Sequence, residues 1–169
     1  AKQAAGLESD GISVAADAPE KAVAKSKALG DSPNPYFNVY RSYSEPGGIA
    51  DQMRATAAAN PDVMKLEQIG TSTLGKPILV IKMTADARNV ADGSRPALLF
   101  SAVNHAREWL AAEEGRRLPL WFAEHKNDPK IKALLQKEEL WFEPIMNVDG
   151  YDFTFTCGTG TAQHMCDYR

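Results

Sequence analysis

The sequence predicts an α/β fold in which helices flank a mixed β-sheet. Short β-rich apolar runs alternate along the chain with segments whose apolar residues recur at helical spacing. The chain has 169 residues, of which 44% are hydrophobic and 24% charged, as is usual for a globular protein with a core of its own. One folded domain is therefore expected.

The composition also excludes several classes of protein. Lys and Arg number 19 against 22 Asp and Glu, and no basic stripe stands out, so nucleic acid is not an expected partner. No apolar run approaches the roughly 18 residues that a membrane span needs. The chain begins at Ala1 and lacks the apolar region of a signal peptide, which suggests a processed or excerpted product.

The first 34 residues differ from the rest. Residues 1–34 are rich in Ala, Lys, Asp and Ser and carry few large apolar side chains. Such a segment buries too little surface to offset the entropy of ordering it, so we expect a flexible tail or linker. The cluster Ser32-Pro33-Asn34-Pro35 marks a boundary, and residues 35–169 form the expected folded domain.

A helix and a hairpin come first in that domain. Apolar residues at helical spacing, including Ile49 and Met53, predict a helix over about 46–59. The β-rich runs 63–69 and 77–83 flank a glycine-containing loop and predict an antiparallel hairpin. The loop has the GxxxxGK spacing of a phosphate-binding loop, but proline and a strand follow where Ser or Thr and a helix are required. Phosphate binding is therefore rejected.

The next elements are a strand and a long helix. After a polar loop with a turn at Asp92-Gly93, the apolar run 97–103 predicts a buried strand. A helix is predicted over about 108–125, with Pro119 expected to kink or interrupt it. We expect Trp109, Ala112, Trp121 and Phe122 to pack inward, and Glu113, Glu114, Arg116 and Lys126 to face water.

The last elements are shorter. Asp128-Pro129 predicts the start of a short helix, and 140–146 reads as a strand that ends at Asn147. The residues Asn147, Asp149 and Gly150 are most simply a turn, because Asn, Asp and Gly tolerate turn geometry. No catalytic role is assigned to them.

The segment Asn104-His105-Ala106-Arg107-Glu108-Trp109 carries the candidate chemistry. His105 would lie in the turn after the buried strand and Glu108 in the first helical turn, so both side chains can converge above the carboxyl end of the strand. A catalytic zinc commonly takes two His and one Glu and keeps a fourth position open. The alternative is that His105 caps the turn and Glu108 complements the helix dipole.

These residues also carry a family resemblance. The string NHAREW, the following helix and the later Asn-Val-Asp-Gly-Tyr resemble the zinc carboxypeptidases of the carboxypeptidase A/B type, over about residues 36–169. The resemblance implies that His105 and Glu108 bind a catalytic zinc and that Arg107 helps to hold a peptide substrate. It further implies that the chain supplies the N-terminal half of the sheet.

The resemblance also implies what this sequence lacks. The family's third zinc ligand, its general base and its binders of the substrate carboxylate would lie beyond Arg169, so no catalytic residue is assigned here. His125 is 17 positions from Glu108 on one helix and cannot share its metal. His164 is expected to be a solvated loop residue.

The two cysteines, Cys157 and Cys166, have eight residues between them in a Gly- and Thr-rich stretch. This spacing suits a small disulfide-closed loop, and two free thiols would look the same in sequence. The resemblance to secreted enzymes favours the disulfide and implies an extracellular location.

We therefore predict part of a zinc-dependent metallocarboxypeptidase that acts on the C-terminus of peptides or proteins and is a monomer when complete. The polypeptide itself is expected to be inactive, because the third ligand and the base are missing. Two alternatives remain open: a non-catalytic binding module, and a related zinc amidohydrolase that acts on acylated amino acids or cell-wall peptides.

Overall fold

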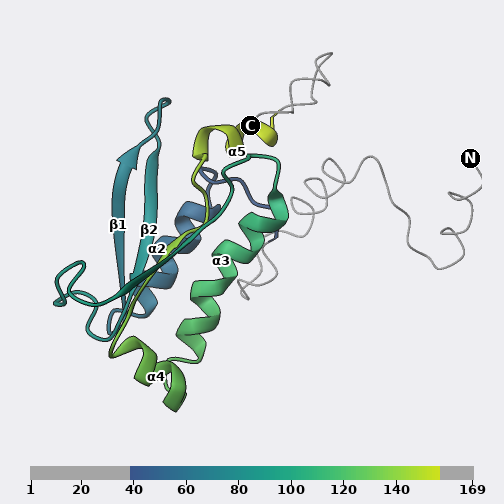
Figure 1. The fold of residues 1–169 in the computed structure, drawn as a ribbon. Coiled ribbons are helices and arrows are strands. Elements are labelled where there is room, and N and C mark those ends of the chain that lie inside the picture. Colours follow the sequence, from purple (N-terminus) through teal and green to yellow (C-terminus); the bar gives the residue numbers. More distant parts are fainter. Residues whose placement is uncertain (1–38, 157–169) are drawn as a thin grey trace, which may run out of the picture.

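The computed structural model describes residues 39–156, which form a sheet with helices on one face and at both ends (Figure 1). The expected tail 1–34, the boundary at residues 32–35 and the Cys157–Cys166 pair lie outside the described residues, as does His164. The predicted α/β class with a mixed sheet is confirmed.

The sheet has four strands in the order β1-β2-β4-β3. Their bounds are β1 Met64–Thr71, β2 Pro77–Met83, β3 Ala97–Ser101 and β4 Glu139–Glu143. The pairs β1–β2 and β2–β4 are antiparallel, whereas β3 and β4 run parallel. The predicted hairpin is thus confirmed as β1–β2, with Gly75 in the left-handed region (φ 81°) at its turn.

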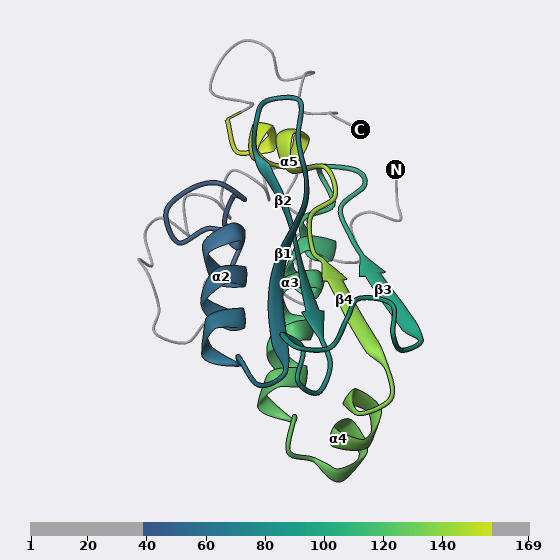
Figure 2. The same ribbon diagram turned by 90° about the vertical axis from the view of Figure 1, so that its left-hand side faces the viewer.

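The four described helices are α2 Ile49–Ala59, α3 Trp109–Glu124, α4 Pro129–Leu135 and α5 Val148–Thr154. Two of them, α2 and α3, lie on the same face of the sheet (Figures 1 and 2), whereas α4 and α5 lie at opposite ends of it. Because β3 and β4 are parallel, the chain between them must cross from one end of the sheet to the other. The helices α3 and α4 make that crossover.

Local signals in the sequence set the helix starts. α2 begins at Ile49 rather than near residue 46, because Gly48 is its N-cap residue. α4 begins at Pro129, where a proline is favourable since the first helical N–H needs no partner inside the helix. The Asp128 side chain accepts hydrogen bonds from Lys130 N and Ile131 N and caps α4.

The main hydrophobic core lies between the sheet and α2 and α3. Alternate residues of β2 point into it, among them Ile81 and Met83, each 0% exposed. Phe142 of β4 stacks on Phe100 of β3 with ring centroids 5.1 Å apart. The core therefore joins the two halves of the sheet and fixes the ends of β3 and β4, from which the candidate site is built.

The opposite face of β2 carries a buried lysine beneath the polar loop. Lys82 is 0% exposed, and its Nζ lies 2.7 Å from Asp92 Oδ1 and donates to Val90 O at 2.9 Å. The Glu139 carboxylate lies 3.6 Å from the same Nζ. The Lys82 ammonium holds the pKa of the Asp92 carboxyl below its usual value. The interactions of Lys82 with Val90 and Asp92 thus hold the loop between β2 and β3 against the sheet.

β3 departs from the prediction of a buried strand. Leu98 and Leu99 are 54% and 59% exposed. Among residues 39–156, β3 is an edge strand that pairs only with β4. An apolar run indicates that burial of the strand is favourable, but it does not show which residues cover the strand or whether they belong to residues 39–156.

α3 departs from its predicted faces. Glu113 and Arg116 were expected in water but are 4% and 3% exposed, because their side chains pair with each other and Glu113 Oε1 also accepts from Tyr40 N at 2.8 Å. Trp121, expected inside, is 44% exposed. Pro119 lies within α3 and does not interrupt it.

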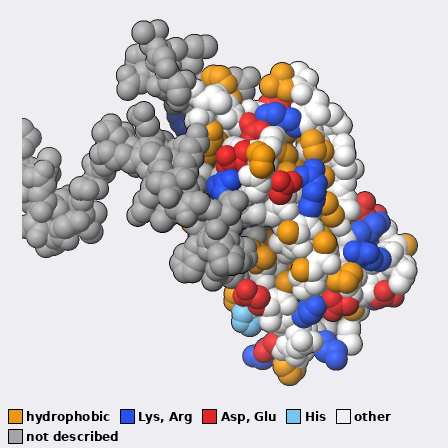
Figure 3. Space-filling model, turned by 180° about the vertical axis from the view of Figure 1, so that it is seen from behind, with side chains coloured by type: hydrophobic (Ala, Val, Ile, Leu, Met, Phe, Trp, Pro, Cys, Tyr) orange, Lys and Arg blue, Asp and Glu red, His pale blue; other side chains and the backbone are white. Residues whose placement is uncertain are grey.

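The molecular surface carries both signs of charge. On the face seen in Figure 3, acidic and basic side chains are interspersed with apolar ones. No helix within the described residues has the length and apolar character needed to cross a membrane.

Candidate metal centre

The segment between β3 and α3 is fixed by the residues that follow β4. Ala102 N donates to Glu143 O at 3.0 Å, which extends the parallel pairing by one step. Asn147 N donates to Val103 O at 3.1 Å. Val103 then adopts φ 54°, in the left-handed region, and turns the chain out of the sheet. The segment 104–108 therefore projects from the carboxyl end of β3.

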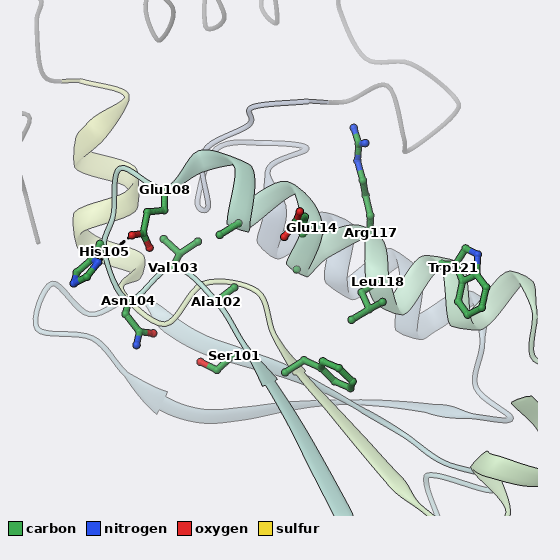
Figure 4. Close-up of a pocket in the computed structure, with 13 residues that line it drawn as sticks. Ser101, Ala102, Val103, Asn104, His105, Glu108, Glu114, Arg117, Leu118 and Trp121 are labelled. Carbon is green, nitrogen blue, oxygen red and sulfur yellow. Dashed lines mark hydrogen bonds and ion pairs between the residues drawn. The ribbon is translucent and has the colours of Figure 1, made fainter.

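His105 and Glu108 face each other across this segment. The His105 Nδ1 and Glu108 Oε1 atoms are 3.0 Å apart, and the two side chains are 54% and 50% exposed. Figure 4 shows both side chains at the turn between β3 and α3. The predicted convergence of the two groups at this strand end is confirmed, whereas their role as metal ligands stays a prediction.

Glu108 is the N-cap residue of α3, yet its side chain makes no capping hydrogen bond. Its backbone oxygen accepts from Ala111 N at 3.0 Å and begins the helix. The Glu108 carboxylate therefore takes no part in capping α3. The Glu108 carboxylate is directed at His105 instead and contacts its Nδ1 directly.

The pair fits part of a zinc site. Zinc binds His nitrogen and carboxylate oxygen at about 2.0 to 2.2 Å in tetrahedral geometry, so two such atoms on one ion lie about 3.3 to 3.6 Å apart. The observed 3.0 Å between His105 Nδ1 and Glu108 Oε1 is a hydrogen-bond distance, a few tenths of an ångström shorter than that separation. Within residues 39–156 no three His, Cys, Asp or Glu side chains are grouped closely enough to hold a metal ion. The described residues thus offer two ligands.

A groove of about 920 Å³ runs from this pair along α3 (Figure 4). His105 and Glu108 lie at one end of it and Trp121 near the other. Its walls are mostly apolar and include Phe100 and Leu118. The candidate ligands therefore border an open, largely apolar surface.

The remaining predicted residues lie elsewhere. Arg107 is exposed between the two candidate ligands and is not among the residues that line the groove. His125 is at the far end of α3, stacked on Trp121 with ring centroids 4.3 Å apart. The expectation that His125 cannot join His105 is confirmed. Glu114 is exposed on α3, as expected.

The sequence reasoning missed α5. The segment taken for a turn at 147–150 is the start of a helix, in which Asn147 Oδ1 accepts from Gly150 N at 2.9 Å. An Asn followed by an acidic residue in the first turn is an N-terminal helix signal, and it was available in the sequence. This helix lies against residues 104–108, which carry the two candidate ligands and are called the metal turn from here on.

The fold and the facing side chains define an α/β protein that carries a histidine and a glutamate side by side at the carboxyl end of a strand, His105 and Glu108. Residues 49–167 match the family model described as zinc carboxypeptidase, which covers most of the chain. The protein belongs to the zinc carboxypeptidase family.

Its relatives are carboxypeptidases. The chain is 32% identical to carboxypeptidase A1 of Sus scrofa over 123 residues, which is 70% of this chain and 27% of that protein. It is 26% identical to a zinc carboxypeptidase of Saccharothrix mutabilis subsp. capreolus over 76% of this chain and 29% of the relative. The fold resembles a solved carboxypeptidase A from Helicoverpa armigera, with a TM-score of 0.61, 22% identity, and coverage of 82% and 32% of the two chains. The sequence therefore spans less than a third of these relatives.

Proposed function

We propose that residues 35–169 are the N-terminal part of the catalytic domain of a zinc-dependent metallocarboxypeptidase. The observation that carries this proposal is the 3.0 Å approach of His105 Nδ1 to Glu108 Oε1 at the carboxyl end of β3, in a chain of the zinc carboxypeptidase family. The substrate would be the C-terminal end of a peptide or protein. The third ligand and the general base would come from residues other than 39–156.

His105 and Glu108 would hold the zinc through Nδ1 and the carboxylate. When bound, zinc lowers the pKa of a coordinated water to about 7 and polarises a peptide carbonyl. Both side chains are about half exposed, so a substrate can reach their side of the turn. Arg107, exposed between them, would contact the peptide as a permanent cation.

The polypeptide of residues 1–169, expressed alone, should not hydrolyse peptides. Residues 39–156 supply two protein ligands, which leave the zinc site incomplete, because a catalytic site uses three. Attack by water also needs a group that takes its proton. Peptide hydrolysis by this polypeptide alone would contradict the proposed division of the site.

The test of the zinc assignment is the metal content of the protein purified from its source and of two variants. His105→Ala should lose tight zinc binding and peptide hydrolysis together. His125→Ala, which changes an exposed histidine at the other end of α3, should keep both. Normal zinc content in His105→Ala would overturn the assignment.

The same preparations separate the reaction classes. Release of C-terminal residues from peptides supports a carboxypeptidase. Hydrolysis of N-acylated amino acids without peptide hydrolysis would point to an amidohydrolase.

We also propose an extracellular protein in which Cys157 and Cys166 form a disulfide, on the basis of the resemblance to secreted enzymes and the spacing in sequence. Alkylation under non-reducing conditions should leave both thiols unmodified, as measured by the mass of the protein. Alkylation of both without reduction would contradict the disulfide.

A further inference from the structure

One of the two residues between the candidate ligands, Ala106, packs against α5. Ala106 is 0% exposed. A Cβ atom placed on Gly150 of α5 would lie 2.9 Å from the Ala106 Cβ, closer than two carbon atoms approach without displacement. It would also lie 2.7 Å from the Asn147 side chain. The absence of a side chain at residue 150 is therefore what lets the metal turn seat against the helix.

The chain that enters the turn is tied to the same helix. Asn147, the N-cap residue of α5, donates its backbone N–H to Val103 O at 3.1 Å. Its side-chain Nδ2 lies 3.5 Å from Asn104 O, at the limit of a hydrogen bond. The position of α5 thus sets where the turn begins.

The chain that leaves the turn is tied to the other end of α5. Trp109 directly follows Glu108, and its Nε1 donates to Thr154 Oγ1 at 2.8 Å. The Trp109 ring stacks on Phe155 with centroids 4.3 Å apart and an interplanar angle of 5°. Contacts with α5 therefore occur before, between and after the two candidate ligands.

α5 is itself held on its other side by two carboxylates. Asp149 accepts from Ser72 Oγ at 2.8 Å and from Leu74 N at 3.0 Å, both in the β1–β2 turn. Asp152 accepts from Tyr43 N at 2.6 Å and also pairs with a lysine of the hairpin. A shift of the helix away from the hairpin would break these bonds, and a shift toward it is opposed by atoms that are already in contact.

We propose that α5 is the positioning element of the metal turn, with Gly150 as the residue that determines the distance between the turn and the helix. This inference rests on the proposed function, since it assumes that His105 and Glu108 hold the metal. Metal sites lose affinity when the groups that orient their ligands change, by roughly 10- to 100-fold. Gly150 would act on the candidate ligands through Ala106, which lies between them in the sequence.

The test is Gly150→Ala, with zinc affinity measured on the purified protein by competition with a chromophoric chelator. The added methyl group should displace the turn and weaken zinc binding about 10- to 100-fold. Gly48→Ala is the matched control, because a Cβ there would lie 2.4 Å from Ser42 O, at the start of α2. The control should lower the thermal midpoint and leave zinc affinity unchanged.

A double substitution separates the Ala106 contact from the Asn147 contact. Ala106→Gly removes the methyl group that the new side chain at residue 150 would meet. Gly150→Ala should therefore lower zinc affinity less in the Ala106→Gly background than in the parent. Equal zinc affinity in the parent and Gly150→Ala would overturn the role of α5.

Hydrogen exchange provides a second measurement that needs no metal. The amides of residues 104–109 should exchange at least about threefold faster in Gly150→Ala than in the parent or in Gly48→Ala, because a displaced turn opens more often. Unchanged exchange would overturn the inference. A parent protein that binds no zinc but shows faster exchange in Gly150→Ala would instead contradict the proposed function and leave the positioning contact in place.

Discussion

Val103 combines two properties that oppose each other. Its side chain is 2% exposed, and its backbone has φ 54°, which a β-branched residue adopts only at a cost of about 1 to 3 kcal/mol. It immediately precedes the metal turn. Strain at this position is therefore the local cost of turning the chain out of the sheet toward His105.

The strain predicts an unusual response to truncation. At Val80, which is also 2% exposed but lies in β2, substitution by glycine should cost about 3 kcal/mol of unfolding free energy through lost burial and a more flexible chain. Val103→Gly loses a similar side chain but relieves the strain, so it should cost about 1 to 2 kcal/mol less. Urea denaturation of both variants measures the difference, and equal costs would show that Val103 is unstrained.

At the residue scale the sequence predicted that His105 and Glu108 would lie close together. Their proximity was predictable because a histidine and a glutamate three positions apart at a strand-to-helix turn can reach one point. Their metal role stays a prediction. The conformation of Val103 was not predictable, since valine is the last residue one would place in the left-handed region. The burial of Glu113 and Arg116 was also missed, because helical spacing treats each charge alone and cannot show that the two neutralise each other.

Between elements, one phenol ties the segment before α2 to β2. Tyr43 is 1% exposed; its hydroxyl donates to Pro77 O at 2.7 Å and accepts from Leu79 N at 3.2 Å. Burial raises the pKa of Tyr43 to about 12. The neutral hydroxyl is the form that makes both bonds.

The raised pKa of Tyr43 predicts how the stability that its hydroxyl contributes changes at alkaline pH. A pKa raised above its unfolded value contributes stability that is complete below about pH 10 and is lost as the pH rises toward 12. The stability gap between the parent and Tyr43→Phe should therefore narrow by about 1.4 kcal/mol per pH unit in that window. Denaturation curves from pH 8 to 12 measure the gap, and a constant gap would contradict the assigned pKa.

Elements with strong local signals were predicted well from the sequence. β2 has the expected bounds, Pro77–Met83, because a turn and a proline define its start. α5 was missed because seven residues give too few turns for an apolar period, and an Asn-x-Asp-Gly pattern suits a turn equally. Its identity as a helix depends on contacts with distant residues such as Ala106.

For the molecule as a whole, the exposed edge of β3 predicts self-association. Leu98 and Leu99 are exposed on a strand that pairs on one side only among residues 39–156. Such edges pair with other chains, and a lysine on the edge opposes this. Leu99→Lys in the 169-residue polypeptide should raise the concentration at which it associates by at least about threefold.

Sedimentation over a concentration series checks this prediction. Leu74→Lys is the control, since Leu74 is 71% exposed at the hairpin turn and not on the sheet edge. An equal effect of both lysines would mean that added charge, and not the β3 edge, governs association.

The order of the strands in the sheet could not be predicted from the sequence. Alternating strands and helices predicted the α/β class, yet nothing in a strand's composition shows that β4 inserts between β2 and β3. That order depends on which pairing buries the most surface once α3 and α4 have crossed the sheet.

The contacts between the metal turn and α5 join residues about 43 positions apart, as between Asn104 and Asn147. Contacts so distant in sequence carry the entropy cost of closing the intervening loop, so they form later than the local contacts of helices and hairpins. During synthesis the His105 turn leaves the ribosome long before α5 does. The relative position of His105 and Glu108 is therefore completed late in folding. A metal ion that reached the chain earlier would meet these two side chains before α5 had positioned them.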